Sequence, residues 1–378
     1  MKILFACGGT AGHINPALAV ATLVRRDHPE ADILFAGNPD GMEARLVPQA
    51  GFRFLPFRSM GIQRQLSWNN IKYNARSLCL LATVRGRAAK LLRSFQPDIV
   101  FGTGSYISAP ILMEAAHLGY KTMTHEANAL AGVSNRMVAE KVDRFLIAVE
   151  EAKTHLPPRK DYVVTGNPVR PEVLTADRGT ARQKLRIPPE QLCLLSFGGS
   201  LGAQTINRAI ADLMAWHAPS GKIHHIHATG SFGVELLPQL LREKKVPFEG
   251  NPNFDIREYI NDMPDCLAAA DLVIARAGAM TLAELEAAGR ASVLIPSPNV
   301  AENHQYHNAM VLANHNAAIV IEEKDLTGDT LVETVSALVQ DTQRLRQLGA
   351  NARSIAVLDS NERIVRELYA LYDGKKEK

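Results

Sequence analysis

The chain has 378 residues, 46% of them hydrophobic and 21% charged, which is an ordinary composition for a globular protein. A formal net charge of +3 is too small to indicate a nucleic-acid-binding protein, although it suits an anionic nucleotide substrate or an anionic membrane surface. The length predicts two or three domains, and no run approaches the roughly 18 apolar residues of a membrane-spanning helix.

The N-terminal region opens with a strand, a glycine-rich turn and a helix. Residues 2–7, apolar after Lys2, predict a buried strand, residues 8–13 form the turn, and residues 16–26 carry apolar side chains at helical spacing. Residues 31–37 predict a second strand. A strand, glycine turn, helix and strand in this order are the opening of a doubly wound α/β domain.

The rest of the first half continues the alternation of helices and strands. Residues 69–95 have apolar side chains at helical spacing and predict a long helix. Further strands are predicted at residues 97–101, 121–126, 144–148 and 162–166. The last of them is stopped by Asn167-Pro168.

A second cycle of the same kind begins near residue 193. Residues 193–197 predict a strand, residues 198–203 a glycine turn, and residues 204–214 a helix. Strand candidates follow at residues 223–229, 254–258, 272–275 and 292–295. The unit of strand, Gly-Gly turn and helix therefore occurs twice, about 190 residues apart. This repetition favours two similar lobes over one large sheet.

The domain boundary is best placed between the two cycles. The prediction is an N-terminal lobe of residues 1–166 and a C-terminal lobe of residues 167–354. A terminal helix of about residues 355–373 is expected to pack back on the first lobe.

Four cysteines lie far apart and include no Cys-x-x-Cys pair: Cys7, Cys79, Cys193 and Cys266. This spacing predicts free buried thiols in a reducing compartment. The apolar start of the chain breaks at Gly8-Gly9, too early for the apolar region of a signal peptide. We therefore expect a cytoplasmic protein that is soluble or peripherally bound to a membrane.

The two glycine turns, residues 8–13 and 198–203, each follow a strand and open a helix, which is where open α/β sheets bind ligands. Glycine permits close approach of the backbone, and free N–H groups at a helix start attract anions such as a diphosphate. The first turn lacks the G-x-G-x-x-G spacing of a dinucleotide site, and no Walker motif is present. The alternative for each turn is a tight connection without a ligand. Two turns in mirrored positions favour a ligand cleft between lobes.

A third glycine site, residues 276–284, follows a predicted strand and opens another helix. Thr281 and Glu284 are three residues apart and could form a capping box, an interpretation that requires no ligand. In the functional interpretation Glu284 accepts hydrogen bonds from a ribose diol, because a carboxylate can take two donors at once. The sequence leaves both interpretations open.

Six blocks in a fixed order, spanning roughly residues 8–309, carry a resemblance to one family. The blocks are G-G-T-A-G-H-I-N-P-A at 8–17, H-E-A-N at 125–128 with Ala131-Gly132, T-G-N-P-V-R at 165–170, G-G-S-L-G-A at 198–203, the 276–284 block, and N-H-Q-Y-H-N-A at 303–309. Together they resemble the MurG family of bacterial peptidoglycan N-acetylglucosaminyltransferases. The sequence departs from the family pattern at Ala127, Leu201 and His304, where members often carry glutamine.

The resemblance implies two Rossmann-like, doubly wound lobes of the GT-B type that face one another across a cleft. It implies UDP-N-acetylglucosamine as donor, held mainly by the C-terminal lobe of residues 167–354. The implied acceptor is the lipid-linked muramyl-pentapeptide precursor (lipid I), with the N-terminal lobe of residues 1–166 facing the acceptor and the membrane. The product is then lipid II, formed with inversion at the transferred sugar. The residues implied to contact substrate are Thr10, Ala11, Gly12, Asn128, Arg170, Ser200, Ile260, Ala279, Met280, Thr281, Leu282, Ala283, Glu284 and Gln305. Among these, Ile260 would lie against uracil and Gln305 would hold sugar hydroxyls.

Such a reaction needs a base for the acceptor hydroxyl. His13 is the candidate, because it closes the first glycine turn and an unperturbed histidine, with a pKa near 6.5, can accept a proton at neutral pH. The alternative is a structural histidine that only closes the turn. Glu126 is the rival base, whereas His125 is expected to pack or to orient its neighbours.

The leaving diphosphate also needs its charge stabilised. The sequence has no Asp-x-Asp motif, and the helix starts at residues 200–203 and 278–281 supply N–H groups and a favourable dipole. We therefore expect no essential metal and no cofactor. His225 and His227 share a strand face, and His304 and His307 are three apart, but neither pair has a convincing third ligand.

The segment of residues 58–93 contains no Asp or Glu. Its basic residues are Arg58, Arg64, Lys72, Arg76, Arg85, Arg87, Lys90 and Arg93, and its apolar residues include Met60, Ile62, Leu66, Trp68, Leu78, Leu80 and Leu81. Basic residues around apolar ones suit an anionic membrane interface, and the alternative is a core helix with a solvated basic face. We expect a peripheral protein at the cytoplasmic face of the cell membrane, with other cell-wall synthesis proteins as candidate partners.

Three other functions are considered. The first is a related GT-B enzyme with another lipid or natural-product acceptor. The second, a nicotinamide-dependent oxidoreductase, is disfavoured by the missing dinucleotide fingerprint. The third is a non-catalytic sugar-nucleotide binder, in which His13 would be dispensable.

Overall fold

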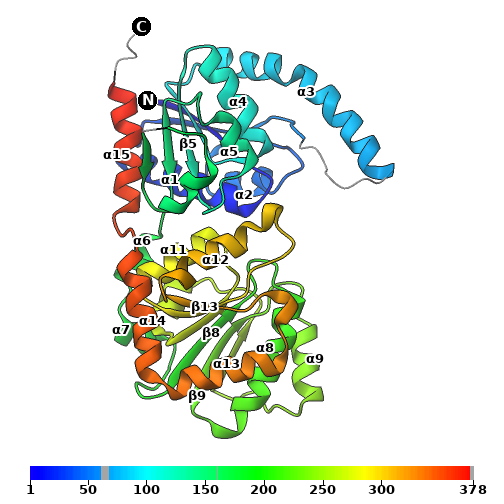
Figure 1. Ribbon diagram of the computed structural model, residues 1–378, viewed down its shortest axis with the longest axis vertical. Helices are drawn as coiled ribbons and strands as arrows, with labels where there is room; N and C mark the ends of the chain where they lie inside the picture. The colour runs from blue at the N-terminus through cyan, green and yellow to red at the C-terminus, as the bar shows by residue number, and fades with distance from the viewer. Residues whose placement is uncertain (61–67, 160, 375–378) are drawn as a thin grey trace. The chain divides into compact units, whose positions relative to one another are not determined.

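The computed structural model describes residues 1–60, 68–159 and 161–374, and the chain divides into two compact units. One unit comprises Met1–Pro168 together with Asp359–Lys378, and the other comprises Val169–Leu358. Each unit is built on its own parallel sheet with helices packed against it (Figure 1). The prediction of two doubly wound α/β lobes is confirmed.

The described part of the first unit holds a seven-stranded parallel sheet in the order β3-β2-β1-β4-β5-β6-β7. The strands are β1 (Lys2–Ala6), β2 (Asp32–Gly37), β3 (Arg53–Pro56), β4 (Ile99–Gly102), β5 (Lys121–Glu126), β6 (Arg144–Ile147) and β7 (Tyr162–Val164). The helices are α1 (Ala11–Asp27), α2 (Glu43–Gln49), α3 (Trp68–Phe95), α4 (Ser105–His117), α5 (Val133–Val138), the 3-10 helix η1 (Glu150–His155) and α15 (Ser360–Asp373).

The central strands of this sheet are apolar on both faces because helices cover both sides. In β1, Leu4 and Ala6 join a core with α3, α4 and α5, whereas Ile3 and Phe5 join a second core with α1, α2 and α15. The Phe5 and Phe35 rings stack in the second core with centroids 4.9 Å apart. A continuous apolar run such as residues 3–7 is therefore the expected signature of a strand covered on both faces.

The C-terminal helix α15 packs against α1, β5 and β6 of the first unit (Figure 1). Its Ile364 and Leu368 are fully buried there. The single terminal helix predicted from residue 355 is wrong in its start, since α14 ends at Ile355 and α15 begins at Ser360. The polar run Asp359-Ser360-Asn361 explains the break, because these residue types favour a new helix start.

The second unit holds a six-stranded parallel sheet in the order β10-β9-β8-β11-β12-β13. The strands are β8 (Leu192–Phe197), β9 (Ile223–Ala228), β10 (Phe254–Arg257), β11 (Leu272–Ala275), β12 (Ala291–Leu294) and β13 (Ala318–Val320). The α-helices are α6 (Pro171–Thr175), α7 (Arg178–Lys184), α8 (Gln204–His217), α9 (Leu236–Glu243), α10 (Met263–Ala269), α11 (Ala279–Ala288), α12 (His304–Asn314), α13 (Gly328–Gln340) and α14 (Thr342–Ile355). The 3-10 helices are η2 (Ala218–Ser220), η3 (Ala301–Asn303) and η4 (Glu323–Asp325).

Two edge strands were not predicted from the sequence. Strand β3 reads Arg-Phe-Leu-Pro and is largely exposed, so it lacks the apolar run that marks a central strand. Strand β13 has three residues, too few for a periodic signal. Both lie at the end of their sheet, where one side of the strand has no hydrogen-bonded neighbour.

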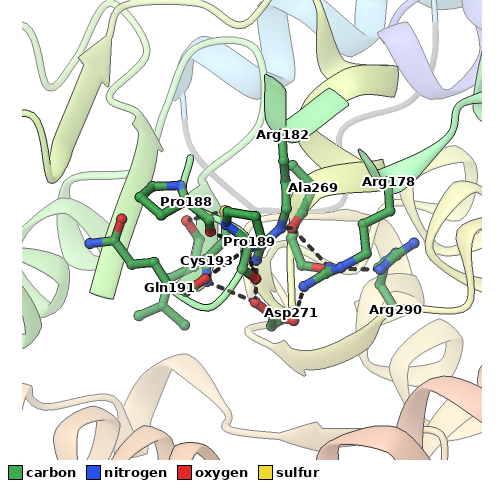
Figure 2. Close-up of polar contacts among 11 residues, drawn as sticks. Arg178, Arg182, Pro188, Pro189, Gln191, Cys193, Ala269, Asp271 and Arg290 are labelled. Atoms are coloured by element: carbon green, nitrogen blue, oxygen red, sulfur yellow. Dashed lines mark hydrogen bonds and ion pairs between the residues drawn. The ribbon is translucent and has the colours of Figure 1, made fainter. Parts of the chain in front are cut away.

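An ionic cluster lies at the amino ends of β8 and β11 in the second sheet, at the edge opposite the glycine turns (Figure 2). The Asp271 carboxylate accepts hydrogen bonds from Arg178 at 2.6 Å, from Arg182 at 2.8 Å and from the Cys193 amide at 2.8 Å. Arg182 is almost fully buried and also donates to several backbone carbonyls. Burial lowers the pKa of the nearby Arg290 to about 10. One carboxylate thus holds two strand starts together.

Candidate active site

Each sheet reverses its strand order at one point, and the glycine turns lie at these two points. In the first unit the order reverses between β1 and β4, so the turns after β1 and β4 lie next to one another at the carboxyl ends of the strands. In the second unit the corresponding pair is β8 and β11, which precede the turn of residues 198–203 and the block of residues 276–284. Doubly wound sheets bind ligands at such positions.

The first turn is shorter than predicted, because α1 begins at Ala11 and not at Pro16. Gly8 and Gly9 have φ of 158° and 84°, and this sharp bend lets the helix start at once. Pro16 lies inside the helix, so a proline that can mark a helix start was misleading here. Gly12 and His13 consequently stand on the first turn of α1, and the Thr10 side chain makes no cap hydrogen bond.

His13 is held in one tautomer by the turn that follows β4. Its Nδ1 lies 2.8 Å from the carbonyl oxygen of Thr103, and the Thr103 hydroxyl donates to the His13 carbonyl at 2.6 Å. A carbonyl oxygen can only accept, so Nδ1 carries the proton. In the neutral ring the lone pair is then on Nε2, the atom that can accept a proton from a substrate. His13 is half-buried.

A buried carboxylate that the sequence patterns did not reveal supports the same turn. Glu43, the first residue of α2, is fully buried, and it accepts the Gly9 amide at 3.1 Å and the Asn38 amide at 2.8 Å. A Cβ at Gly8, Gly37 or Gly41 would collide with its side chain. The available signal was an acid preceded by glycines at 37 and 41, which is weak without the fold.

Asn38 extends this support to two further turns of the first unit. The side-chain nitrogen of Asn38, Nδ2, donates to the Ser59 carbonyl at 2.9 Å and lies 3.3 Å from the Tyr106 hydroxyl. The Ser59 hydroxyl in turn donates to the backbone carbonyl of Tyr106, and the Tyr106 ring lies against Gly9. The turns after β1, β2, β3 and β4 are therefore tied together around Glu43.

Glu126 ends β5 and is surrounded by donors. One carboxylate oxygen accepts the amide and the side chain of Asn128, both at 3.0 Å. The other accepts the Gly132 amide and the Asn135 side chain, both at 2.9 Å. These four bonds use the acceptor positions of a carboxylate, and Glu126 is buried. The structure thus gives Glu126 the role of an anchor for the loop that carries Asn128.

His125, the neighbour of Glu126, points to the opposite face of β5 and is also buried. Its Nε2 lies 3.0 Å from the Gly166 carbonyl, so this nitrogen donates. Burial lowers the pKa of His125. This hydrogen bond to Gly166 links β5 to the segment that follows β7, in keeping with the packing role expected for His125.

The second glycine turn presents Ser200 and Leu201 to solvent. Gly202 has φ of 79° and packs against the backbone of Thr229 and Gly230, so closely that a Cβ at Gly202 would overlap the Thr229 carbonyl. Helix α8 follows directly and has no side-chain cap. The first amides of a helix have no acceptor inside the helix, and such helix starts are a common place for anions to bind in proteins.

The third block is a helix start, but the capping box predicted as its alternative is wrong. Helix α11 begins at Ala279 with Gly278 as its N-cap, and no side chain caps it, so Thr281 already lies within the first turn. Glu284 instead pairs with Arg170 through two hydrogen bonds, Nε to Oε1 at 2.5 Å and Nη2 to Oε2 at 2.7 Å. Both residues were predicted in the site, but their pairing was not.

The remaining predicted residues differ in what they can offer a ligand. Leu282 and Ile260 are buried, so their side chains belong largely to the core. The predicted positions that are half-exposed on α11 are Ala279, Met280, Thr281 and Ala283. Gln305, on α12, accepts the Ser297 amide at 2.9 Å through Oε1, so its side chain offers the NH₂ group as a donor.

The basic segment of residues 58–93 is described only in part, because residues 61–67, among them Ile62, Arg64 and Leu66, lie outside the described residues. The side chains of residues 68–79 and 81 are not described either. In the described part, Arg58 pairs with Asp40 at 3.3 Å and Arg85 pairs with Glu114 at 2.9 Å, so acids from elsewhere meet this segment. The last turns of α3 bury core side chains and expose Lys90 and Arg93. That half of α3 is a core helix with a basic outer face.

Membrane-spanning and metal-binding features are both absent from the described part of the chain. No helix in residues 1–60, 68–159 and 161–374 is long and apolar enough to cross a membrane. Over the same residues, no three His, Cys, Asp or Glu side chains converge in a way that could hold a metal ion. Cys7, Cys193 and Cys266 are free and buried, as expected, and the side chain of Cys79 is outside the described set.

Two family models match the chain, one for each half. The glycosyltransferase family 28 N-terminal domain matches residues 3–147, and the glycosyltransferase family 28 C-terminal domain matches residues 193–364. A relative from Acetivibrio thermocellus is 41% identical over 96% of both chains, and one from Desulforamulus reducens is 37% identical over 94% of both. Both relatives are named UDP-N-acetylglucosamine--N-acetylmuramyl-(pentapeptide) pyrophosphoryl-undecaprenol N-acetylglucosamine transferase.

Solved structures agree with this match. The crystal structure of Acinetobacter baumannii MurG superposes with a TM-score of 0.75 at 25% identity, covering 97% of this chain and 99% of that one. A UDP-GlcNAc 2-epimerase from Neisseria meningitidis superposes with a TM-score of 0.62 at 12% identity, over 98% of this chain and 100% of that one. The second likeness shows the shared fold alone.

Proposed function

This chain belongs to glycosyltransferase family 28, and from that membership we infer that it transfers N-acetylglucosamine from UDP-N-acetylglucosamine to lipid I, giving lipid II for peptidoglycan synthesis. The relatives at 37–41% identity over nearly the whole chain carry this activity in their names. One structural observation carries the chemistry. The Thr103 carbonyl fixes the proton of His13 on Nδ1, so Nε2 is ready to act as a base.

The reaction is written as a single displacement with inversion at the transferred sugar. The acceptor hydroxyl oxygen forms a bond to the anomeric carbon while the bond from that carbon to the UDP oxygen breaks. The hydroxyl proton passes to Nε2 of His13, and the electron pair of the broken bond leaves on the diphosphate. General-base help of this kind typically contributes about 10²–10⁴ in rate.

The donor is proposed to bind in the second unit. The first amides of α8 and α11 face the diphosphate, where the helix dipoles favour negative charge and no metal is required. The pairing of Glu284 with Arg170 is compatible with ribose recognition, because each carboxylate oxygen has a second lone pair for a hydroxyl donor. The NH₂ group of Gln305 would donate to sugar hydroxyls.

Glu126 is proposed to be a positioning residue and not the base. Its four hydrogen bonds hold the loop that carries Asn128, and a carboxylate so occupied has no free lone pair for a substrate proton. Asn128 itself is half-buried and would contact the sugar.

We also place the enzyme at the cytoplasmic face of the cell membrane, because its acceptor is a membrane lipid. The exposed basic residues Lys90 and Arg93 on α3 would favour anionic headgroups. Flotation with vesicles of increasing anionic lipid content tests this proposal. Binding should rise with that content and fall with salt, whereas binding indifferent to lipid charge would refute the electrostatic part.

The base assignment is tested by two alanine substitutions at the two ends of one helix. His13→Ala should lower kcat by about two orders of magnitude or more while the affinity for UDP stays near that of the wild type. His28→Ala is the matched control, since His28 is the C-cap of α1 and is half-exposed. Radiolabelled sugar transferred to lipid I is the readout. Near-normal turnover in His13→Ala would eliminate His13 as the base.

A further inference from the structure

Five buried polar side chains in the second unit form one continuous hydrogen-bonded set, which we call the histidine network. Their exposed fractions lie between 0% and 2%. In the order of their contacts, they are His217, His225, Ser196, His227 and Asn207. They come from the end of α8, from β9, from β8 and from the start of α8. None of them was assigned a part in the proposed reaction.

The links of the histidine network are all short. His217 Nε2 lies 3.0 Å from His225 Nδ1, and His225 Nε2 lies 2.7 Å from the Ser196 hydroxyl. That hydroxyl lies 2.7 Å from His227 Nδ1, and His227 Nε2 lies 2.8 Å from Asn207 Oδ1. The side-chain nitrogen of Asn207, Nδ2, donates to the Thr229 carbonyl at 3.0 Å.

The position of every proton follows from the last link. The Thr229 carbonyl can only accept, so the NH₂ group of Asn207 faces it and the amide oxygen of Asn207 faces His227. An amide oxygen also only accepts, so His227 carries its proton on Nε2. A neutral His227 ring then accepts at Nδ1, and the Ser196 hydroxyl must donate to it.

The same reasoning places the protons in the other half of the histidine network, from Ser196 to His217. The single proton of Ser196 is used on His227, so the Ser196 oxygen accepts from Nε2 of His225. His225 then accepts at Nδ1 from Nε2 of His217. All five donors therefore point the same way, from His217 towards Thr229. Hydrogen bonds aligned in this manner polarise and strengthen one another.

The neutral state of the network follows from its surroundings. Burial lowers the pKa of His217 to about 4 and that of His227 to about 3, and it also lowers the pKa of His225 well below its ordinary value. The titratable groups that act on His225 are His217, His227 and His224 on the far face of β9, and each disfavours a further positive charge.

The network ends on the backbone that supports the second glycine turn. Gly202 and Gly230 pack backbone to backbone, and either would collide with the other turn if it carried a Cβ. The Phe232 amide donates to the Leu201 carbonyl at 3.1 Å, so the turn at residues 229–233 holds the turn at residues 198–203. Asn207 also fills the space beside Gly233. A shift of the Thr229 carbonyl would thus be transmitted to Gly202.

We propose that the histidine network positions the glycine turn of residues 198–203 for the donor diphosphate, with His227 and Asn207 as the positioning residues nearest to the turn. The proposal rests on the proposed function, because it takes this turn to be the diphosphate site. In this proposal the network acts on the turn from behind, through the Thr229 carbonyl and through Asn207 beside Gly233. Its loss should therefore weaken donor binding and leave acceptor binding unchanged.

The test compares two substitutions at one position. In His227→Gln the side-chain NH₂ can take the place of Nε2–H and still donate to Asn207, whereas in His227→Asn the shorter side chain cannot reach it. The Kd for UDP, measured by calorimetry, should stay within about twofold of the wild type for glutamine and rise about tenfold for asparagine. The KM for the sugar nucleotide should change in the same direction as this Kd, whereas the KM for lipid I should not change.

His224→Asn is the matched control, because His224 is a buried histidine on the same strand but points to the opposite face. It should lower stability without changing the Kd for UDP. Equal UDP affinity in His227→Asn and the wild type would overturn the proposal, and so would an equal loss in His224→Asn.

A measurement on the unmodified protein keeps the proposal testable if His227→Asn does not fold. In protein labelled with ¹⁵N-histidine, the nitrogen shifts at pH 7 should place the proton on Nε2 of His217, His225 and His227. A proton on Nδ1 of His227 would overturn the proposal. Failure of the wild type to bind UDP at all would instead refute the proposed function, since the tautomers are read without any ligand.

Discussion

Gly41 and Glu43 form a pair whose coupling tests whether the buried carboxylate organises the first glycine turn. Replacement of Glu43 by alanine leaves the amides of Gly9 and Asn38 without their acceptor. A buried unsatisfied donor costs about 1–3 kcal/mol, so the local free energy of opening should fall by roughly 2–6 kcal/mol. Transfer activity should fall with it, because the Gly8-Gly9 bend sets where α1 and His13 begin.

Gly41→Ala should be harmful only while Glu43 is present. The added Cβ would lie within 3.0 Å of three carboxyl atoms of Glu43, and overpacking of this kind costs about 1–3 kcal/mol. In the double variant the carboxyl group is absent, so that cost should vanish. The cycle therefore predicts a coupling of about 1–3 kcal/mol, with the double variant more stable than the sum of the single effects.

Hydrogen exchange of the peptide that contains β1 and the Gly9 amide measures the effect locally, and the transfer rate measures it functionally. Gly86→Ala is the control, because a Cβ at Gly86 meets nothing within 4 Å. The effect of Gly86→Ala on exchange and on the transfer rate should be small, and it should be the same with and without Glu43. Additive effects of Gly41→Ala and Glu43→Ala would refute the supporting role assigned to the carboxylate.

Three further predictions concern the second unit. Asp271→Asn should lower the free energy of unfolding by about 3–5 kcal/mol in urea titrations, since it leaves buried arginine charge unpaired; a loss under 1 kcal/mol would contradict the role of the ionic cluster. Gly202→Ala should abolish UDP binding measured by calorimetry, whereas Gly199→Ala, with φ of 93° but nothing near its Cβ, should retain most of it. Stability should fall on acidification, because the unfolded chain binds protons below pH 6.5 while burial holds the folded pKa values of His217 and His227 at about 4 and about 3. The free energy of unfolding should fall by roughly 1.4 kcal/mol per pH unit for each histidine, between its unfolded and its folded pKa. Urea midpoints that do not change between pH 7 and pH 5 would contradict this prediction.

The fold was readable from the sequence because its signals are local. The largely apolar strands at residues 2–7 and 193–197 are each covered by helices on both faces, and each is followed by a Gly-Gly turn that opens a helix. The errors also have local causes. Pro16 resembled a helix start but lies inside α1, and the exposed strand β3 has no apolar run to detect.

The candidate site was readable only where its residues belong to motifs. His13 stood out because it follows the glycine turn, but its tautomer depends on Thr103, 90 residues away. Glu43 carries no motif at all, and its importance comes from glycines that leave room for its carboxylate. The pairing of Arg170 with Glu284 spans 114 residues and could not be inferred from spacing.

The transfer reaction itself tests the proposed function most directly. The wild-type chain, supplied with radiolabelled UDP-N-acetylglucosamine and lipid I in the presence of excess chelator, should form labelled lipid II and release one UDP for each sugar transferred. Absence of label in the lipid, or transfer that requires an added divalent ion, would contradict the roles assigned to His13 and to the helix starts of α8 and α11.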